Sequence, residues 1–192
     1  MENNIKLTFF DKFLKITLLP FIPDWISPNH VTLFRIIMIP VIILSLTFEF
    51  FHLAAILFAI AAFSDAVDGA LARVRNQITD IGKIMDPIAD KVLVLTVIIM
   101  IAPQYIGWPL IVATLVIEFM LVGNAYVVQK RKTEITNAHG TGKIKMVAQS
   151  FSILFLFTFI IFSLPLLLTI SKVLLLISVI FGATSLFIYR SI

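Results

Sequence analysis

The chain has 192 residues, 60% of them hydrophobic, and a mean hydropathy of +1.06. These values lie far above those of soluble proteins and indicate an integral membrane protein. The sequence has no cysteine, which excludes disulfides, thiolate metal sites and a cysteine nucleophile. The net charge of +4 comes from basic residues beside apolar segments, a pattern that points to membrane topology and anionic phosphate and away from nucleic acid.

The first 26 residues are predicted to form a juxtamembrane amphipathic segment, followed by one transmembrane domain over residues 27–192. A helix over residues 5–19 would gather the polar side chains of this segment on one face. These are Thr8, Asp11, Lys12 and Lys15. The pattern fits an interfacial helix on the membrane surface, and its wide apolar arc equally fits packing against the transmembrane bundle.

Six apolar segments follow, each long enough to cross a bilayer as a helix. They are residues 31–50, 52–72, 84–102, 109–128, 144–164 and 166–189. The sequence therefore predicts an all-α membrane protein, in which the N-terminal amphipathic interfacial helix precedes a bundle of six transmembrane helices.

Basic residues gather at those ends of the segments that share one side of the membrane. They are Lys6, Lys12, Lys15, Arg73, Arg75, Lys83, Lys130, Arg131, Lys132, Lys143, Lys145 and Arg190. The positive-inside rule therefore predicts that both termini are cytosolic. The sequence lacks a basic, serine-rich transit segment, which favours a prokaryotic plasma (inner) membrane over a mitochondrial one.

Four aspartates interrupt the second and third apolar segments. Asp65 and Asp68 share one helix face, and Asp86 and Asp90 recur one turn apart on the next helix. A carboxylate inside a membrane helix costs on the order of 2.5–3.5 kcal/mol, so four of them need compensating partners. Divalent cations that prefer oxygen ligands would supply the compensation. The sequence therefore predicts two Mg²⁺ or Mn²⁺ ions at this cytosolic end.

Small residues accompany the aspartates. Gly69 and Ala72 fall on the face of the first pair, and Gly82 falls on the face of the second pair. They would leave room for a bulky phosphorylated ligand, whose phosphate Arg73 would meet at the edge of the face. Metal-bound carboxylates beside an arginine suit phosphoryl transfer. The alternative is that these acids lie at solvated helix ends and pair with nearby cations.

Proline follows the third aspartate directly. Pro87 lies inside a predicted helix, where it would either kink the helix or mark its first turn. Either arrangement would place Asp86 near a helix start, where free backbone N–H groups favour anions.

Together these residues form the string D-x2-D-G-x2-A-R-x8-G-x3-D-x3-D, which resembles the signature of the CDP-alcohol phosphotransferase (class I CDP-alcohol phosphatidyltransferase) family. Every defined position is present, namely Asp65, Asp68, Gly69, Ala72, Arg73, Gly82, Asp86 and Asp90. Residues 86–91, DPIADK, are similar to the phosphatidylglycerophosphate synthase branch. Residues 27–35 and 142–145 add to the likeness, which covers roughly residues 27–152.

The resemblance implies transfer of a phosphatidyl group from CDP-diacylglycerol to glycerol 3-phosphate, with release of CMP. It makes Asp65, Asp68 and Asp86 metal ligands, and it makes Asp90 the catalytic base beside the same metal site. It also implies that residues of the signature line the CDP site. These are Asp68, Gly69, Ala72, Arg73 and Gly82. The family resemblance further leads us to expect a homodimer.

The acceptor site departs from that branch, whose fourth span usually carries Arg-Glu and a later arginine. Here Ile117 precedes Glu118, and Ala125 stands near the second arginine position. Fixed cations would still be needed to bind an acceptor phosphate. The candidates are Arg131, Lys143 and Lys145. The buried acid Glu118 is expected either to pair with a basic residue of the site or to bond to a neighbouring helix.

Other hypotheses fit part of the pattern. The same chemistry would serve inositol phosphate or phosphatidylglycerol as acceptor. A cation-coupled transporter would use the acids as an ion path, but it would not need Gly69, Ala72 or Arg73 and would favour internal repeats, which are absent here. A polyprenyl transferase would carry two separate aspartate-rich motifs.

Overall fold

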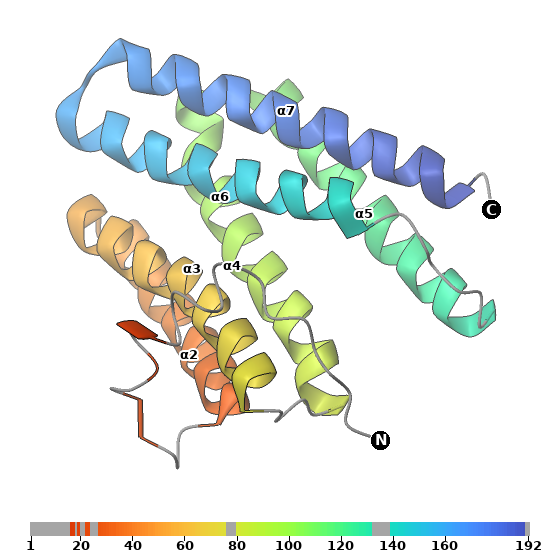
Figure 1. The fold of residues 1–192 in the computed structure, drawn as a ribbon. Helices are drawn as coiled ribbons and strands as arrows, with labels where there is room; N and C mark the ends of the chain where they lie inside the picture. The colour runs from red at the N-terminus through yellow and green to blue at the C-terminus, as the bar shows by residue number, and fades with distance from the viewer. Residues whose placement is uncertain are drawn as a thin grey trace. The chain divides into compact units, whose positions relative to one another are not determined.

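The computed structural model describes residues 16, 17, 19, 22, 23, 27–75, 80–131 and 139–190, without the side chains of residues 66, 80–84, 125–131, 139 and 187–190. Within these ranges six long helices follow one another and no strand occurs (Figure 1). They are α2 (Pro28–Thr47), α3 (Phe51–Val74), α4 (Asp80–Tyr105), α5 (Trp108–Arg131), α6 (His139–Phe162) and α7 (Pro165–Arg190). The all-α prediction is confirmed, and each predicted segment corresponds to one helix.

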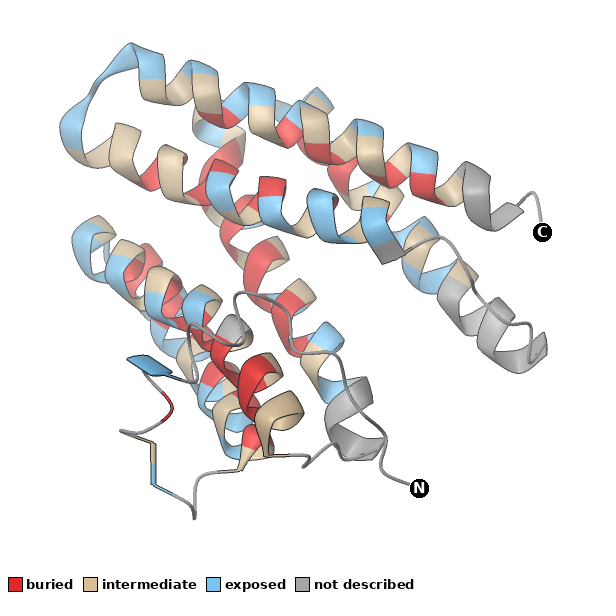
Figure 2. Cartoon of the chain, in the orientation of Figure 1, coloured by how far each residue is buried: buried red, intermediate tan, exposed pale blue. Residues whose placement is uncertain are grey.

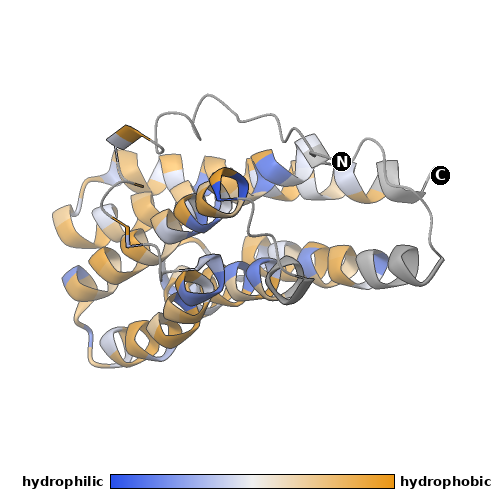
Figure 3. Cartoon of the chain, turned by 60° about the horizontal axis from the view of Figure 1, so that its bottom comes forward, coloured by the Kyte–Doolittle hydropathy of each residue, from blue (hydrophilic) through white to orange (hydrophobic). Residues whose placement is uncertain are grey.

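Hydrophobic residues occur along most of the length of these helices (Figure 3). Among the described residues, four stretches are long and apolar enough to span a membrane. They are Pro28–Thr47, Phe51–Val74, Gly140–Phe162 and Pro165–Leu186. The apolar part of α5, Trp108–Asn124, is shorter, about 26 Å as a helix. The protein is therefore a multi-pass membrane protein, and the count of six spans stays a prediction.

The chain divides into two compact units, Met1–Leu93 and Val94–Ile192, and the division falls inside α4. In the first unit α2 packs against α3, while in the second unit α7 packs against both α5 and α6. The buried faces follow helical spacing, as the red stripes of Figure 2 show. In α2, for example, Ile39, Ile42 and Leu46 are all buried, and these apolar faces form the interior.

The start of α2 is fixed by local signals. Ser27 is the N-cap residue, Pro28 occupies the first helical position, and the Ser27 backbone N–H donates to His30 Nδ1 at 3.1 Å. Proline suits this position because its missing N–H would have no helical partner there. Thr32 and Arg35 follow within the first two turns and lie on one face of the helix.

The N-terminal segment contacts the first unit where it is described. Leu19 is buried against Ala70 and Leu71 of α3. The guanidinium of Arg75 donates to the backbone carbonyls of Ile22, at 2.7 Å, and Pro23, at 3.2 Å. The end of the segment therefore packs against the helices, which was one of the two alternatives. The polar face predicted over residues 5–19 lies largely outside the described residues.

The predicted position of Asp86 near a helix start is wrong. Helix α4 begins at Asp80 and continues through Pro87, so Asp86 is its seventh residue. Only the first four residues of a helix have N–H groups without helical partners, and Asp86 lies beyond them. A proline in the second turn removes one backbone hydrogen bond without ending the helix here. Asp86 instead accepts a hydrogen bond from a side chain of α2, as described below.

Candidate active site

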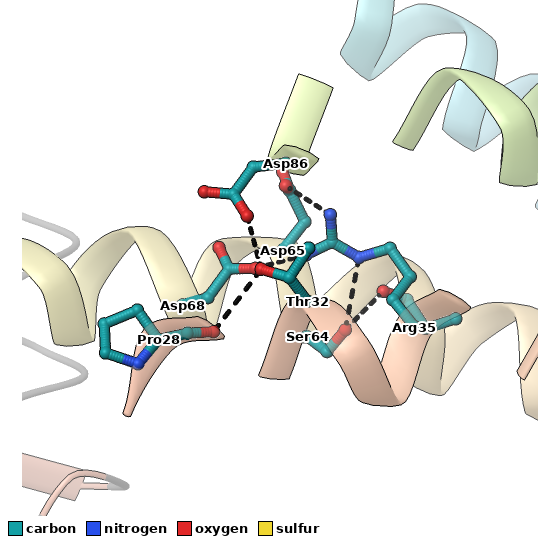
Figure 4. Close-up of polar contacts among 8 residues, drawn as sticks. Pro28, Thr32, Arg35, Ser64, Asp65, Asp68 and Asp86 are labelled. Carbon is teal, nitrogen blue, oxygen red and sulfur yellow. Dashed lines mark hydrogen bonds and ion pairs between the residues drawn. The ribbon is translucent and has the colours of Figure 1, made fainter. Parts of the chain in front are cut away.

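A fully buried arginine of α2 holds two of the predicted aspartates. The Arg35 side chain is 0% exposed; its Nη2 lies 2.5 Å from Asp68 Oδ2, and its Nη1 lies 3.1 Å from Asp65 Oδ1. Its Nε donates to Ser64 Oγ at 3.5 Å. The two aspartates are three residues apart on α3, so they present their carboxylates on the same side of the helix. One guanidinium therefore neutralises part of the charge of both carboxylates (Figure 4).

The third aspartate joins this group from α4. Asp86 Oδ1 accepts a hydrogen bond from Thr32 Oγ1, one turn before Arg35 on α2. Asp65 and Asp86 both lie close enough to Asp68 for their negative charges to repel its own. Figure 4 shows the carboxylates from α3 and α4 gathered beside Thr32 and Arg35. The structure thus brings together Asp65, Asp68 and Asp86, and each of them contacts a side chain of α2.

Burial differs sharply within the group. The side chain of Asp68 is 4% exposed, whereas that of Asp65 is 40% exposed. Asp90, one turn beyond Asp86 on α4, is 7% exposed. The site thus has a buried floor and an accessible rim, through which a hydrated ion or a charged headgroup can approach the carboxylates.

The donor set fits a divalent cation. Three carboxylates and one guanidinium leave an excess of two negative charges, and carboxylate oxygens are the ligands that Mg²⁺ and Mn²⁺ prefer. Arg35 contacts one oxygen of each of its two partners, and Thr32 contacts one oxygen of Asp86. Among the described residues no three acidic or histidine side chains are already arranged as a metal-binding group. The residue types therefore fit the metal.

The small residues of the signature lie beside the acids on α3. A Cβ atom added to Gly69 would lie 3.3 Å from Nη1 and 3.4 Å from Nη2 of Arg73, so the guanidinium passes directly over the glycine. Ala72 and Arg73 are partly buried. Gly82 belongs to the first turn of α4, and its surroundings are outside the described side chains. Four of the five predicted CDP-binding residues thus occupy one helix, and one of them, Asp68, contacts Arg35.

The acceptor candidates belong to the second unit. Lys145 of α6 is buried and forms an ion pair with Glu118 of α5. Glu118 thus pairs with a basic residue of another helix, and that residue is one of the acceptor candidates. Lys143 is exposed near the start of α6. Arg131 is the last residue of α5, and its side chain lies outside the described ones.

Sequence reasoning assigned no role to Arg35, Thr32 or Ser64. Thr32 and Arg35 lie within the family-like run of residues 27–35, and Ser64 directly precedes the signature. One signal could have found Arg35, because an arginine inside an otherwise apolar span requires an acidic partner. The partners themselves follow only from how α2 and α3 pack.

The chain matches a known protein family and is similar to curated proteins. The family model for CDP-alcohol phosphatidyltransferase matches residues 25–184. A CDP-diacylglycerol–glycerol-3-phosphate 3-phosphatidyltransferase of Yersinia pestis (strain Pestoides F) is 33% identical over 129 residues, which cover 64% of this chain and 71% of the relative. The protein of the same name from Salmonella typhimurium (strain LT2) is 35% identical over the same length and coverage.

Proposed function

The chain belongs to the CDP-alcohol phosphatidyltransferase family, and from that premise we propose that it transfers the phosphatidyl group of CDP-diacylglycerol to glycerol 3-phosphate. The gathering of Asp65, Asp68 and Asp86 at one end of membrane helices carries this proposal. The printed names of the relatives support glycerol 3-phosphate as the acceptor. The products are phosphatidylglycerophosphate and CMP.

Members of the family use divalent metal ions. We assign two such ions, Mg²⁺ or Mn²⁺, to the carboxylates of Asp65, Asp68, Asp86 and Asp90. When bound, they would neutralise the diphosphate of the donor and polarise the phosphorus that reacts. Thr32 and Arg35 hold the carboxylates in place from α2.

The CDP moiety is assigned to the signature face of α3. Gly69 and Ala72 leave space beside the acids, and the guanidinium of Arg73 offers hydrogen-bond donors to a phosphate. We also assign Asp68 and Gly82 to the CDP site.

Asp90 is assigned as the base. The acceptor hydroxyl oxygen forms a bond to the phosphorus of the phosphatidyl group, and the bond from that phosphorus to the CMP oxygen breaks. The hydroxyl proton passes to the Asp90 carboxylate, and CMP leaves with the electron pair of the broken bond. Asp90 is buried, so few water molecules can compete with the acceptor for this base.

Cations of the second unit are assigned to the phosphate of the acceptor. These are Arg131, Lys143 and Lys145. Lys143 is exposed, whereas Lys145 is buried against Glu118, so Lys143 offers the more accessible charge. Together they would replace the arginines that the phosphatidylglycerophosphate synthase branch usually carries in its fourth span.

The membrane arrangement is also part of the proposal. The one-sided distribution of basic residues supports a plasma (inner) membrane protein whose active site and termini face the cytosol. The family resemblance supports a homodimer.

The acceptor is tested by CMP release from CDP-diacylglycerol and Mg²⁺ with purified protein in detergent. We expect release with glycerol 3-phosphate and not with inositol phosphate or phosphatidylglycerol. Release with only one of the other acceptors would leave the proposed phosphatidyl transfer intact and would show that glycerol 3-phosphate is not the acceptor.

Lys143→Gln should raise the KM for glycerol 3-phosphate several-fold. The matched control Lys172→Gln changes an exposed lysine of α7 and should leave that KM unchanged.

A further inference from the structure

We propose that Arg35 is a built-in counter-charge of the metal site. Its guanidinium neutralises Asp65 and Asp68 when no divalent ion is bound, and it lowers the affinity of the same carboxylates for that ion. The inference rests on the proposed function in one respect, since it takes these aspartates as metal ligands. It goes further by giving Arg35 a role in how tightly the metal is held.

Arg35 is buried in apolar surroundings. Arg35 is among the largest side chains that are fully buried, and it lies within the apolar span Pro28–Thr47. A guanidinium in such surroundings needs opposite charge, and the buried carboxylate of Asp68 needs a cation. The structure meets both needs with one contact, at 2.5 Å, and adds Asp65 at 3.1 Å. One side chain therefore neutralises part of the charge of both carboxylates.

The cation is also fixed in place. Arginine keeps its positive charge at every accessible pH, and the Arg35 side chain exposes none of its surface. Ser64 accepts a further hydrogen bond from its Nε and in turn donates to the carbonyl of Ala61 at 2.7 Å. A divalent ion that binds Asp65 and Asp68 would therefore do so beside a cation that cannot move into water. Two cations that share the same carboxylates repel each other strongly in a protein interior.

An opposite role is also conceivable for a residue in this position. A hydrogen-bond donor to a metal-binding carboxylate can orient it, and loss of such a donor typically weakens metal binding by about 10- to 100-fold. Both roles predict that removal of Arg35 impairs the protein, through lower stability in the counter-charge role and through weaker metal binding in the orienting role. Removal of Arg35 raises the metal affinity in the counter-charge role and lowers it in the orienting role. Metal affinity is therefore the quantity to measure.

The experiment compares Arg35→Met, which removes the charge, with Arg35→Lys, which keeps it. Thermal unfolding in detergent is followed as Mg²⁺ is added, and Mn²⁺ binding is measured directly by electron paramagnetic resonance. We expect Arg35→Met to lower the Tm of the metal-free protein, to gain more Tm than wild type from Mg²⁺, and to bind Mn²⁺ roughly tenfold or more tightly. Arg35→Lys should stay near wild type in metal affinity.

Ile42→Ala is the matched control for general destabilisation. Ile42 lies two turns from Arg35 on the same face of α2 and is fully buried, but it is apolar. This variant should lower the Tm and leave the Tm gain from Mg²⁺ unchanged. Should Arg35→Met not fold, Arg35→Gln removes the charge while keeping hydrogen-bond donors.

An unchanged or weaker affinity for Mn²⁺ in both charge-removing variants would overturn the counter-charge role. A wild-type protein that binds no Mn²⁺ would overturn it together with the assigned metal ligands. The acceptor proposal is judged separately, by CMP release. A failure of the counter-charge role can therefore be distinguished from a failure of the acceptor proposal.

Discussion

At the scale of single residues, the site is built from polar pairs that join different helices. Arg35 joins α2 to α3 through Asp65 and Asp68, and Thr32 joins α2 to α4 through Asp86. A charged or polar group without a partner is costly in an apolar bundle, so these contacts fix where the carboxylates lie. Helix α2, which carries no aspartate of the signature, therefore determines the geometry of the site.

Thr32→Val tests the contact to Asp86. Valine has nearly the same shape but cannot donate the hydrogen bond. We expect the kcat of CMP release to fall by about 10- to 100-fold while the protein stays folded, because the carboxylate loses its orienting donor. Thr32→Ser keeps the hydroxyl and should recover most of the rate. A Thr32→Val enzyme as fast as wild type would show that the Asp86 carboxylate does not depend on this contact.

The sequence predicted the four aspartates because their spacing along two helices is a local property. It could not predict the partners of these aspartates, because Arg35 and Asp68 are 33 residues apart, and Thr32 and Asp86 are 54 apart. Such pairs depend on how the helices pack. Glu118 is an intermediate case: burial in an apolar helix predicted a partner, and only the structure identifies Lys145.

At the scale of helices, small and hydroxyl side chains allow close packing in the second unit. Ser152 of α6 and Ser171 of α7 each donate to the backbone carbonyl of the other, both at 2.8 Å. Gly182 of α7 lies so close to α5 that an added Cβ would be 2.5 Å from Ile117 Cγ2 and 3.3 Å from Lys145 Cδ. Small residues commonly serve this purpose between membrane helices. The glycine thus makes room beside the Glu118–Lys145 ion pair.

Gly182→Ala should therefore destabilise the protein. Overpacking a filled interior typically costs about 1–3 kcal/mol, and we expect a lower Tm in detergent. The double variant Gly182→Ala with Ile117→Ala should recover stability, because it removes the atom that clashes.

The control for this substitution is Gly123→Ala in α5, where an added Cβ meets nothing within 4 Å. It should leave the Tm unchanged or raise it slightly, since alanine is the better helix former. Equal effects at Gly123 and Gly182 would contradict the proposed close packing of α5 and α7.

Each described helix from α2 to α7 corresponds to a predicted apolar run, because such runs leave few alternatives in a membrane. Pro87 led to the wrong prediction that Asp86 lies near a helix start, whereas α4 begins at Asp80, four residues before the predicted apolar segment 84–102. Pattern alone cannot show that a helix continues through a proline in its second turn.

At the scale of the whole molecule, the basic residues predict the orientation in the membrane. The absence of cysteine makes this testable with single introduced cysteines. Glu49, in the turn between α2 and α3, and Gly140, at the start of α6, are both exposed. We expect a membrane-impermeant maleimide to label Glu49→Cys in spheroplasts and Gly140→Cys only after permeabilisation. The reverse pattern would place the aspartates on the outer side.

The central claim is that carboxylates supported by α2 carry out a metal-dependent phosphatidyl transfer. Its most direct test is CMP release from CDP-diacylglycerol and glycerol 3-phosphate by wild type, with Mg²⁺ or with a chelator, and by Asp90→Asn. We predict release that stops with the chelator and falls by about 10²- to 10⁴-fold in Asp90→Asn, as expected for loss of a general base. Release that continues in the chelator, or at the wild-type rate in Asp90→Asn, would contradict the account.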